Sequence, residues 1–560
     1  MMLRLAPILI VLLLVAPILA GLAMVLLPAF GYLPALGGES LTLAPWRALF
    51  AEPGIWRSVT ISLASGLLAT AISLAVVLLY LAAATGSRLD RWIRRLISPL
   101  LSLPHAAAAF GLAFLIAPSG LIARLASPGL TGWQRPPDLL IVHDPWGLSL
   151  IAGLVIKEIP FLLLMSLAAL PQLDPERRIA MARSLGYRPT LAWWKVVAPS
   201  LYPLIRLPVY AVIAFASSVV DVAMILGPTL PPTLAVSILT WFSDPDLDKR
   251  FLASAGAILQ LGVTAMALAI WWGLEQAARR LMGLWIAHGG RRRGETGLHL
   301  AGKLWILLAT VVAFVGIAGL AIHSVAGFWR FPNALPQSFT ATHWARALPS
   351  LAGPLASTAL IALASTLLAV TLALAALEHE QRSSRHPSRA LWLLYLPLIV
   401  PQVAFLFGLV VMMEQLGMRP THALVAFGHL LFVLPYVFLS LSEAYRRFDP
   451  RWTRLALTLG ASRNGAFWRI RLPMLLAPIL TALAVGLAVS IGQYLPTQLL
   501  GAGRITTVTT EAVSLAAGGN RRVIGVWALI QASLPLAGFI IAIGLPRLLW
   551  SNRRAMQGAP

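Results

Sequence analysis

The sequence has 560 residues, of which 59% are hydrophobic and 11% are charged. Together with a mean hydropathy of +0.82, this composition excludes a water-soluble globular protein. The absence of cysteine excludes disulfides, thiolate metal ligands and a cysteine nucleophile. Lys and Arg exceed Asp and Glu by 43 to 20, a net charge of +23, so the positions of the charges must distinguish nucleic-acid binding from membrane topology.

Apolar segments long enough to cross a bilayer recur along the whole chain, which predicts an all-α integral membrane protein with about twelve transmembrane helices. The first segment is expected to be a retained helix and not a signal peptide, because its apolar run is long and lacks a small-residue cleavage site. The predicted spans lie near residues 5–30, 56–84, 93–117, 146–171, 201–227, 251–275, 303–326, 354–378, 390–413, 422–442, 474–500 and 522–550.

Basic residues gather in alternate loops, at 88–95, 177–195 and 279–293, whereas acidic residues lie at 138–144 and 244–248. Because Lys and Arg concentrate in cytoplasmic loops, we expect a multi-pass protein of the cytoplasmic (inner) membrane with both termini in the cytoplasm. The positive charge is divided among short loops and forms no continuous basic face, so no nucleic-acid partner is expected.

The two halves of the sequence repeat each other. Residues 63–69 are echoed by residues 363–369, and Gly186 with Pro199 recurs as Gly460 with Pro473, each 274 positions later. Six spans per half give both halves the same orientation, as a parallel repeat. We expect an N-terminal half of residues 1–290 with its core at about 54–275, and a C-terminal half of residues 291–560 with its core at about 350–550. Residues 281–303 are the expected linker.

One loop in each half, at residues 174–199 and 449–473, has the pattern of a short helix, a glycine and a second helix. Asp174-Pro175 and Asp449-Pro450 open these loops, and residues that favour helix follow up to Gly186 and Gly460. A glycine at that position is typical of a helix C-terminus. Each loop therefore offers an exposed helix, unless both are ordinary basic connectors.

These loops resemble the signature of the membrane subunits of binding-protein-dependent (type I) ABC importers: Glu-Ala-Ala, three residues, Gly, nine residues, then Ile-x-Leu-Pro. Ala180 and Arg454 stand at the Glu position, so the acidic residue is missing in both copies. The remaining positions of the two loops that carry the resemblance are Ala182, Gly186 and Pro199 in the first and Ala456, Gly460, Ile470, Leu472 and Pro473 in the second.

The resemblance implies that one chain supplies both membrane domains and that the two loops are coupling helices. It further implies two copies of a cytoplasmic ATPase and a periplasmic or lipid-anchored binding protein as partners. No Gly-x-x-x-x-Gly-Lys-Ser/Thr loop is present, so ATP and Mg belong to the ATPase, and this chain is expected to be no enzyme and to bind no cofactor or metal. Residues 31–38, 141–147 and 225–233 are similar to permeases of thiamine-transport systems, which implies thiamine or a related cation as solute.

Ionisable residues inside spans are costly and are therefore functional candidates. Lys157 and Glu158 fall within the fourth span and Asp221 within the fifth. Adjacent residues on a helix do not face each other, so we hypothesise that Lys157 pairs with Asp221 across the two helices. The alternative is that each of these groups meets water or a backbone carbonyl.

Importers of this family line their path with residues of the fifth span of each domain. That implies Ser217, Ser218 and Asp221 in one half and Gln493 and Tyr494 in the other. An acid opposite a tyrosine suits a cationic aromatic solute. Alternatively, these polar groups pack helices together.

A secondary transporter of the major facilitator type is the alternative function. Residues 86–95 resemble the loop signature of that family, although Ile93 replaces its inner glycine. A membrane-embedded enzyme is disfavoured, because no span carries paired acids, a histidine cluster or a Ser/His arrangement. Pro104-His105 and Pro401-Gln402 are expected to mark helix kinks.

Overall fold

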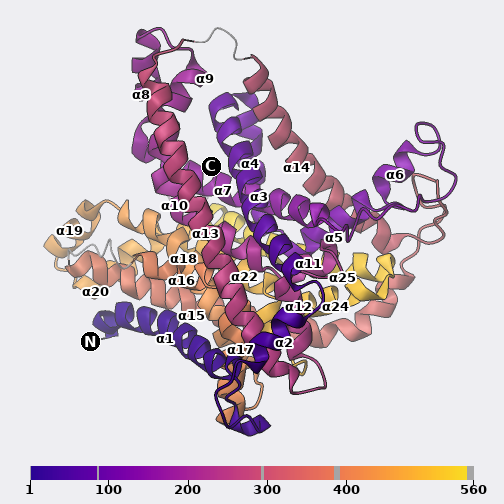
Figure 1. Ribbon diagram of the computed structural model, residues 1–560. Helices are drawn as coiled ribbons and strands as arrows, with labels where there is room; N and C mark the ends of the chain where they lie inside the picture. Colours follow the sequence, from indigo (N-terminus) through magenta and orange to yellow (C-terminus); the bar gives the residue numbers. More distant parts are fainter. Residues whose placement is uncertain (1, 85–86, 292–295, 384–390, 551–560) are drawn as a thin grey trace.

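The computed structural model describes residues 2–84, 87–291, 296–383 and 391–550, and within these ranges it contains helices and two isolated β-bridges but no strand (Figure 1). Among the described residues, ten helices are long and apolar enough to cross a membrane, and two bent helix pairs bring the number to twelve when each pair counts as one span. The prediction of an all-α membrane protein with about twelve spans is confirmed.

The N-terminal half contains α1 (Met2–Ala29), α2 (Ala44–Ala51), α3 (Ile55–Ala84), α4 (Arg88–Ser102), α5 (His105–Ile116), α6 (Leu121–Ala126), α7 (Leu148–Ala169), α8 (Pro175–Ser184), α9 (Pro189–Ala192), α10 (Ala198–Ser218), α11 (Asp221–Leu226), α12 (Leu234–Phe242) and α13 (Lys249–Ala287). The C-terminal half contains α14 (Thr296–Val325), α15 (Thr342–Ser383), α16 (Leu396–Ile399), α17 (Gln402–Gln415), α18 (His422–Arg446), α19 (Pro450–Thr458), α20 (Arg463–Ala466), α21 (Leu472–Met474), α22 (Leu476–Gly492), α23 (Leu495–Leu500), α24 (Val508–Ser514) and α25 (Arg521–Leu549).

Several predicted spans are interrupted. The third breaks before Pro104, and the ninth bends by 92° between α16 and α17, at Pro401. The residues before these prolines, Leu103 and Val400, are extended with ψ of 121° and 125°, because a proline disfavours the α conformation in the residue that precedes it. Both predicted kinks are therefore confirmed.

The connection between the halves is shorter than the predicted linker. Because α13 continues to Ala287 and α14 begins at Thr296, most of residues 281–303 are helical. Arg292 and Arg293 lie outside the described residues. The boundary between residues 290 and 291 falls within this connection, and the division into two domains stays a prediction.

The first helix of each half packs on the other half. Helix α1 runs along α15 and α17, and α14 runs along α3 and α5 (Figure 1). Glycines permit both crossings: a Cβ at Gly408 would lie 1.7 Å from the carbonyl oxygen of Gly21, and a Cβ at Gly111 would lie 3.0 Å from the carbonyl carbon of Gly316. Close backbone approach at small residues is how membrane helices pack tightly. The two halves are thus interlocked by an exchange of helices.

Candidate coupling loops and translocation path

The two coupling loops, residues 174–199 and 449–473, have the same backbone course. Helix α8 is followed by Gly186 with a φ of +87°, and α19 by Gly460 with a φ of +86°. This left-handed conformation favours glycine and terminates each helix. The predicted order of helix, glycine and helix is confirmed in both loops, which lie at the top (α8, α9) and the left (α19, α20) of Figure 1.

Equivalent positions of the two loops also share their exposure. Ala182 and Ala456 are buried at 5% and 6%, whereas Ala180 and Arg454, at the signature Glu position, are exposed. Both helices present large apolar side chains to the outside, at Met181, Leu185, Leu455 and Leu459. The two short helices thus expose apolar side chains at equivalent positions.

After each glycine the chain passes through a short helix and a π-helical turn before it enters the next span. The turns are Trp193–Val197 and Phe467–Arg471, each with an edge-to-face pair of adjacent aromatic rings. Pro199 and Pro473 then lie in the first turn of α10 and α21, where a proline costs no backbone hydrogen bond. Ile470 and Leu472 of the signature, like both prolines, are half-buried.

The first coupling loop is fastened to the connection between the halves. The Lys195 ammonium donates to the carbonyl of Trp285 at 3.2 Å and lies over the rings of Trp285 and Tyr187, 4.9 Å and 5.1 Å from their centroids. The Tyr187 hydroxyl donates to the carbonyl of Gly289 at 3.3 Å. Thr190 and His299 share a further hydrogen bond. These contacts were not predicted, although the loop and the linker were each recognised.

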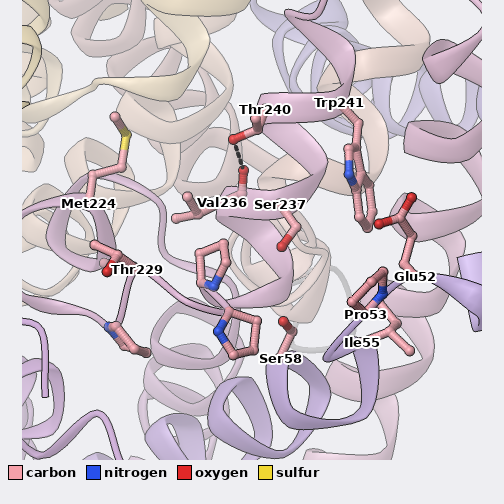
Figure 2. A pocket seen from close by; sticks show the side chains of 14 residues that line it. Glu52, Pro53, Ile55, Ser58, Met224, Thr229, Val236, Ser237, Thr240 and Trp241 are labelled. Carbon is pink, nitrogen blue, oxygen red and sulfur yellow. Dashed lines mark hydrogen bonds between the residues drawn. The ribbon is translucent and has the colours of Figure 1, made fainter. Parts of the chain in front are cut away.

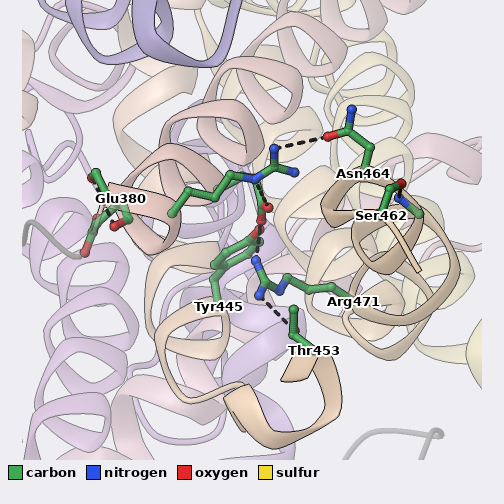
Figure 3. Close-up of polar contacts among 10 residues, drawn as sticks. Glu380, Tyr445, Thr453, Ser462, Asn464 and Arg471 are labelled. Atoms are coloured by element: carbon green, nitrogen blue, oxygen red, sulfur yellow. Dashed lines mark hydrogen bonds and ion pairs between the residues drawn. The ribbon is translucent and has the colours of Figure 1, made fainter. Parts of the chain in front are cut away.

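The second coupling loop is fastened to α15 of its own half (Figure 3). The buried guanidinium of Arg471 donates to the buried carboxylate of Glu378 and, at 3.0 Å, to the hydroxyl of Thr453. Glu378 also accepts from the Tyr445 hydroxyl and, at 2.6 Å, from Arg382. A charge pair of this kind is stable only while all its members are present. Glu378 was not predicted from the sequence, where it stands only as an acidic residue at the end of an apolar run.

Residues from the two halves meet at equivalent breaks in the fifth and eleventh spans. Helix α10 gives way to α11 at residues 219–220, and α22 gives way to α23 at residues 493–494, 274 positions later. Asp221 is the first residue of α11 and Tyr494 directly precedes α23; both are buried and interact electrostatically. The half-buried Gln493 contributes its carbonyl, which accepts from the Thr497 hydroxyl at 3.2 Å.

The hypothesised ion pair between Lys157 and Asp221 is not formed. The Lys157 ammonium instead donates to the carbonyls of Leu100 and Leu101, at 3.3 Å and 3.0 Å. These carbonyls belong to the last turn of α4, which has no intrahelical donors because the helix ends before Pro104. The alternative expectation, a backbone carbonyl, therefore holds for Lys157.

Glu158 lies beside a histidine that the sequence indicated only as a kink. Its Oε1 atom is 3.5 Å from Nε2 of His105, and the His105 ring packs on Phe215 with centroids 4.7 Å apart. His105 also interacts electrostatically with Asp221. The break before Pro104 places His105 at the start of α5, where its side chain reaches α7, α10 and α11.

Ser217 and Ser218 have partners that the helix-packing alternative explains. Both hydroxyls donate to the carbonyl of Ala214, and the Ser217 hydroxyl lies 3.2 Å from that of Thr264 on α13. The side-chain amide of Gln260 donates to the Ser217 carbonyl at 3.1 Å. Ser217 thus holds α10 against α13, whereas the Ser218 hydroxyl bonds within α10.

A cavity of about 450 Å³ lies between the start of α3, helix α11 and helix α12 (Figure 2). Glu52 and Trp241 lie near each other on one side of it, and Met224 on the other. Because α11 contributes Met224 to this cavity and also carries Asp221, one short helix joins the cavity to the break in the fifth span.

Comparison with known proteins decides the family. The family described as "Binding-protein-dependent transport system inner membrane component" matches residues 384–545. The inner membrane ABC transporter permease protein YnjC of Escherichia coli is 33% identical over 507 residues, 90% of each chain. The chain belongs to this family. It is a fused permease of the type I ABC importer kind, and the major facilitator alternative is not favoured.

Two further relatives carry different solutes in their names. The thiamine transport system permease protein ThiP of Haemophilus influenzae is 25% identical over 499 residues, 85% of each chain. The molybdenum transport system permease protein ModB of Mycobacterium tuberculosis is 29% identical over 169 residues, 27% of this chain and 64% of that protein. The family therefore establishes a multi-pass permease of the inner membrane, a transporter subunit, and leaves the solute open.

Proposed function

We propose that the chain forms the whole membrane part of an ATP-driven importer, which moves a small solute from a binding protein outside the membrane into the cytoplasm. Two copies of a cytoplasmic ATPase dock on the two coupling loops. The observation that carries this proposal is the repeated geometry of those loops, each with a glycine-terminated helix and exposed apolar side chains. Two equivalent surfaces call for two equivalent partners.

In this proposal both termini lie in the cytoplasm, on the same side as the coupling loops. ATP and Mg bind to the ATPase subunits, and this chain contributes movement and no hydrolysis. A periplasmic or lipid-anchored binding protein delivers the solute at the opposite end of the helix bundle. The cavity beside α11 lies on the route from that end to Asp221.

Thiamine or a related cation is the proposed solute. Support comes from the carboxylate of Asp221, which interacts electrostatically with Tyr494 of the other half, and from the similarity to ThiP over 85% of the chain. A carboxylate and an aromatic ring attract a ring-bearing cation through charge and cation-π interactions.

Co-purification of the tagged permease with its candidate ATPase tests the coupling proposal. The variant Gly186→Trp with Gly460→Trp places a bulky side chain at two backbone positions with positive φ, and we expect it to lose the ATPase. Gly417→Trp is the matched control, because Gly417 also has a positive φ, of +63°, and has open space around it in the loop between α17 and α18.

Retention of the ATPase by the double variant, or its equal loss in the Gly417→Trp control, would contradict docking at these loops. Uptake that responds to a proton or sodium gradient in the absence of any ATPase would replace the importer by the secondary transporter.

A further inference from the structure

The acidic and basic residues of the candidate path, Lys157, Glu158 and Asp221, belong to the N-terminal half, as does His105. Pro160 of α7 and Pro435 of α18 occupy equivalent positions, 275 apart, which aligns Glu158 with Val433. The equivalent of Asp221 is Leu495, and that of His105 is Gln402. A path built from two repeats is thus charged on one wall and neutral on the other.

These residues lie close to the axis that relates the two halves. Phe161 and Tyr436, which follow the two equivalent prolines, contact each other edge to face with ring centroids 6.2 Å apart. Equivalent residues of a two-fold repeat can touch only near the axis. Glu158 precedes Phe161 by three positions on α7 and so shares its face of the helix, and it also interacts electrostatically with Tyr436.

One carboxylate oxygen of the site has no hydrogen-bond partner. Lys157 is engaged by the carbonyls of α4, and Asp221 forms no ion pair among the described residues. Glu158 is 4% exposed, and its Oε1 atom is buried with no hydrogen bond. Glu158 interacts electrostatically with Lys157, and its Oε1 atom lies 3.5 Å from Nε2 of His105, which is too long for a hydrogen bond. This carboxylate oxygen therefore lacks a hydrogen-bond donor, an arrangement that is costly inside a membrane unless a cation joins it.

Aromatic rings complete the surroundings of these carboxylates. Phe215 packs on His105, Phe161 packs on Tyr436, and Tyr494 interacts electrostatically with Asp221. His105, Phe215 and Tyr436 are half-buried. Rings of this kind stabilise an organic cation through their faces.

We propose that Glu158, His105 and Asp221 form a binding site for a ring-bearing organic cation, in which the cationic centre of the solute takes the place of the His105 imidazole beside Glu158. This inference rests on the proposed function and assigns the recognition of charge to the N-terminal half alone. The binding protein then delivers a cation to the Glu158 carboxylate, whose contact with His105 is too long for a hydrogen bond.

Direct binding to the purified permease in lipid nanodiscs, without ATPase or binding protein, tests this site. The probes are thiamine, as a ring-bearing cation, and thiochrome, its uncharged tricyclic relative. We expect thiamine to bind more tightly than thiochrome, and Glu158→Gln to weaken thiamine binding about tenfold or more, because a desolvated charge interaction is lost. The matched control Asp244→Asn removes an acid from an exposed loop and should leave binding unchanged.

The variant His105→Gln separates recognition from damage to the fold. Gln stands at the equivalent position of the other half, so it fits at the start of such a helix, and removal of the imidazole should tighten thiamine binding about threefold. A destabilised protein would not gain affinity.

Equal affinity for thiamine and thiochrome, unchanged binding in Glu158→Gln, weaker binding in His105→Gln or no thiamine binding by the wild type would each overturn the site. Co-purification with the ATPase reports on the importer function independently, because the coupling loops lie outside this site.

Discussion

The two coupling loops share a backbone but are fastened to different parts of the molecule. The first is held through Lys195 and Tyr187 by residues at the junction of the two halves, Trp285 and Gly289. The second is held through Arg471 by Glu378 on α15 of its own half. The positions are exchanged as well: Val197 occupies the place of Arg471, and Arg469 occupies the place of Lys195.

This difference shows that the repeat preserves the exposed positions of the two loops and not the contacts that fasten the loops to the rest of the molecule. Exposed positions such as Met181 and Leu455 match, whereas the buried side chains behind them have diverged. We expect movement of the second loop to act on α15, and movement of the first to act on the chain that joins the halves. If an ATPase subunit docks on each loop as proposed, the two subunits act on different parts of the molecule.

The largest effect is expected when the buried pair of the second loop is broken. Arg471→Met leaves the Glu378 carboxylate buried with fewer partners, at a cost of about 3–5 kcal/mol. The melting temperature and the rate of ATP-dependent uptake in proteoliposomes would both fall. Val197→Met is the matched change in the first loop, where a larger apolar residue replaces a buried apolar residue, with an expected overpacking cost of about 1–3 kcal/mol. Equal effects of the two variants would remove the difference between the loops.

The helix crossings provide a second comparison between the halves. Gly408→Ala would place a Cβ 1.7 Å from the carbonyl oxygen of Gly21, whereas Gly111→Ala would place one 3.0 Å from the backbone of Gly316. Overpacking costs about 1–3 kcal/mol, so Gly408→Ala should lower the melting temperature more than Gly111→Ala. The reverse order would show that α1 moves to accommodate the added methyl group more readily than α14 does.

A smaller effect is expected at the first loop. Lys195→Met removes a hydrogen bond to Trp285 and contacts with two rings, worth about 1–2 kcal/mol together. We expect this variant to hydrolyse more ATP per solute molecule imported, and this ratio is the quantity to measure. The matched variant Arg469→Met changes an exposed side chain and should leave this ratio unchanged. If only Arg469→Met changed this ratio, the roles assigned to the two coupling loops would be reversed.

The smallest effect concerns the start of the fourth span and its equivalent. Asp144 accepts hydrogen bonds from the backbone of Trp146, Leu148 and Ser149, whereas α18 begins at Thr421 with one such bond. Burial of the Asp144 carboxyl opposes ionisation, but the hydrogen bonds outweigh it and hold its pKa below the usual value. Its contribution is therefore present above the unfolded pKa of about 3.9 and is lost as the pH falls below it.

Unfolding measured against pH checks this capping difference. Asp144→Asn should cost about 1 kcal/mol at neutral pH and should flatten the acid side of the stability profile, whereas Thr421→Ala should leave the shape of that profile unchanged. A profile of Asp144→Asn that keeps the acid slope of the wild type would show that another carboxyl is responsible.

Spans, repeat and coupling loops could be predicted because each rests on a local pattern. Apolar length gives the spans, and the spacing of Gly186 and Gly460 to the following prolines gives the loops. The exchange of α1 and α14 between halves could not be predicted, because Gly21 and Gly408 are distant in sequence and a glycine in an apolar run has many uses.

Within the path, the residue types were predictable and their partners were not. Asp221 and Tyr494 were recognised from their places in equivalent spans, and in the structure the two residues interact electrostatically. Lys157 was given the wrong partner, because the sequence does not show that the end of α4 leaves carbonyls beside it. His105 was treated as a kink, because its neighbour Glu158 is on a different helix.

The exchange of first helices has a consequence for the synthesis of the protein. Gly21 of α1 contacts Phe405, a separation of roughly 380 residues, which at about 5–20 residues per second takes a ribosome some 20–80 s to cover. Throughout that interval α1 stands in the bilayer without its partners on α15 and α17, and lipid or the insertion machinery must cover its glycine-bearing face. Helix α1 is thus made long before its partners on α15 and α17.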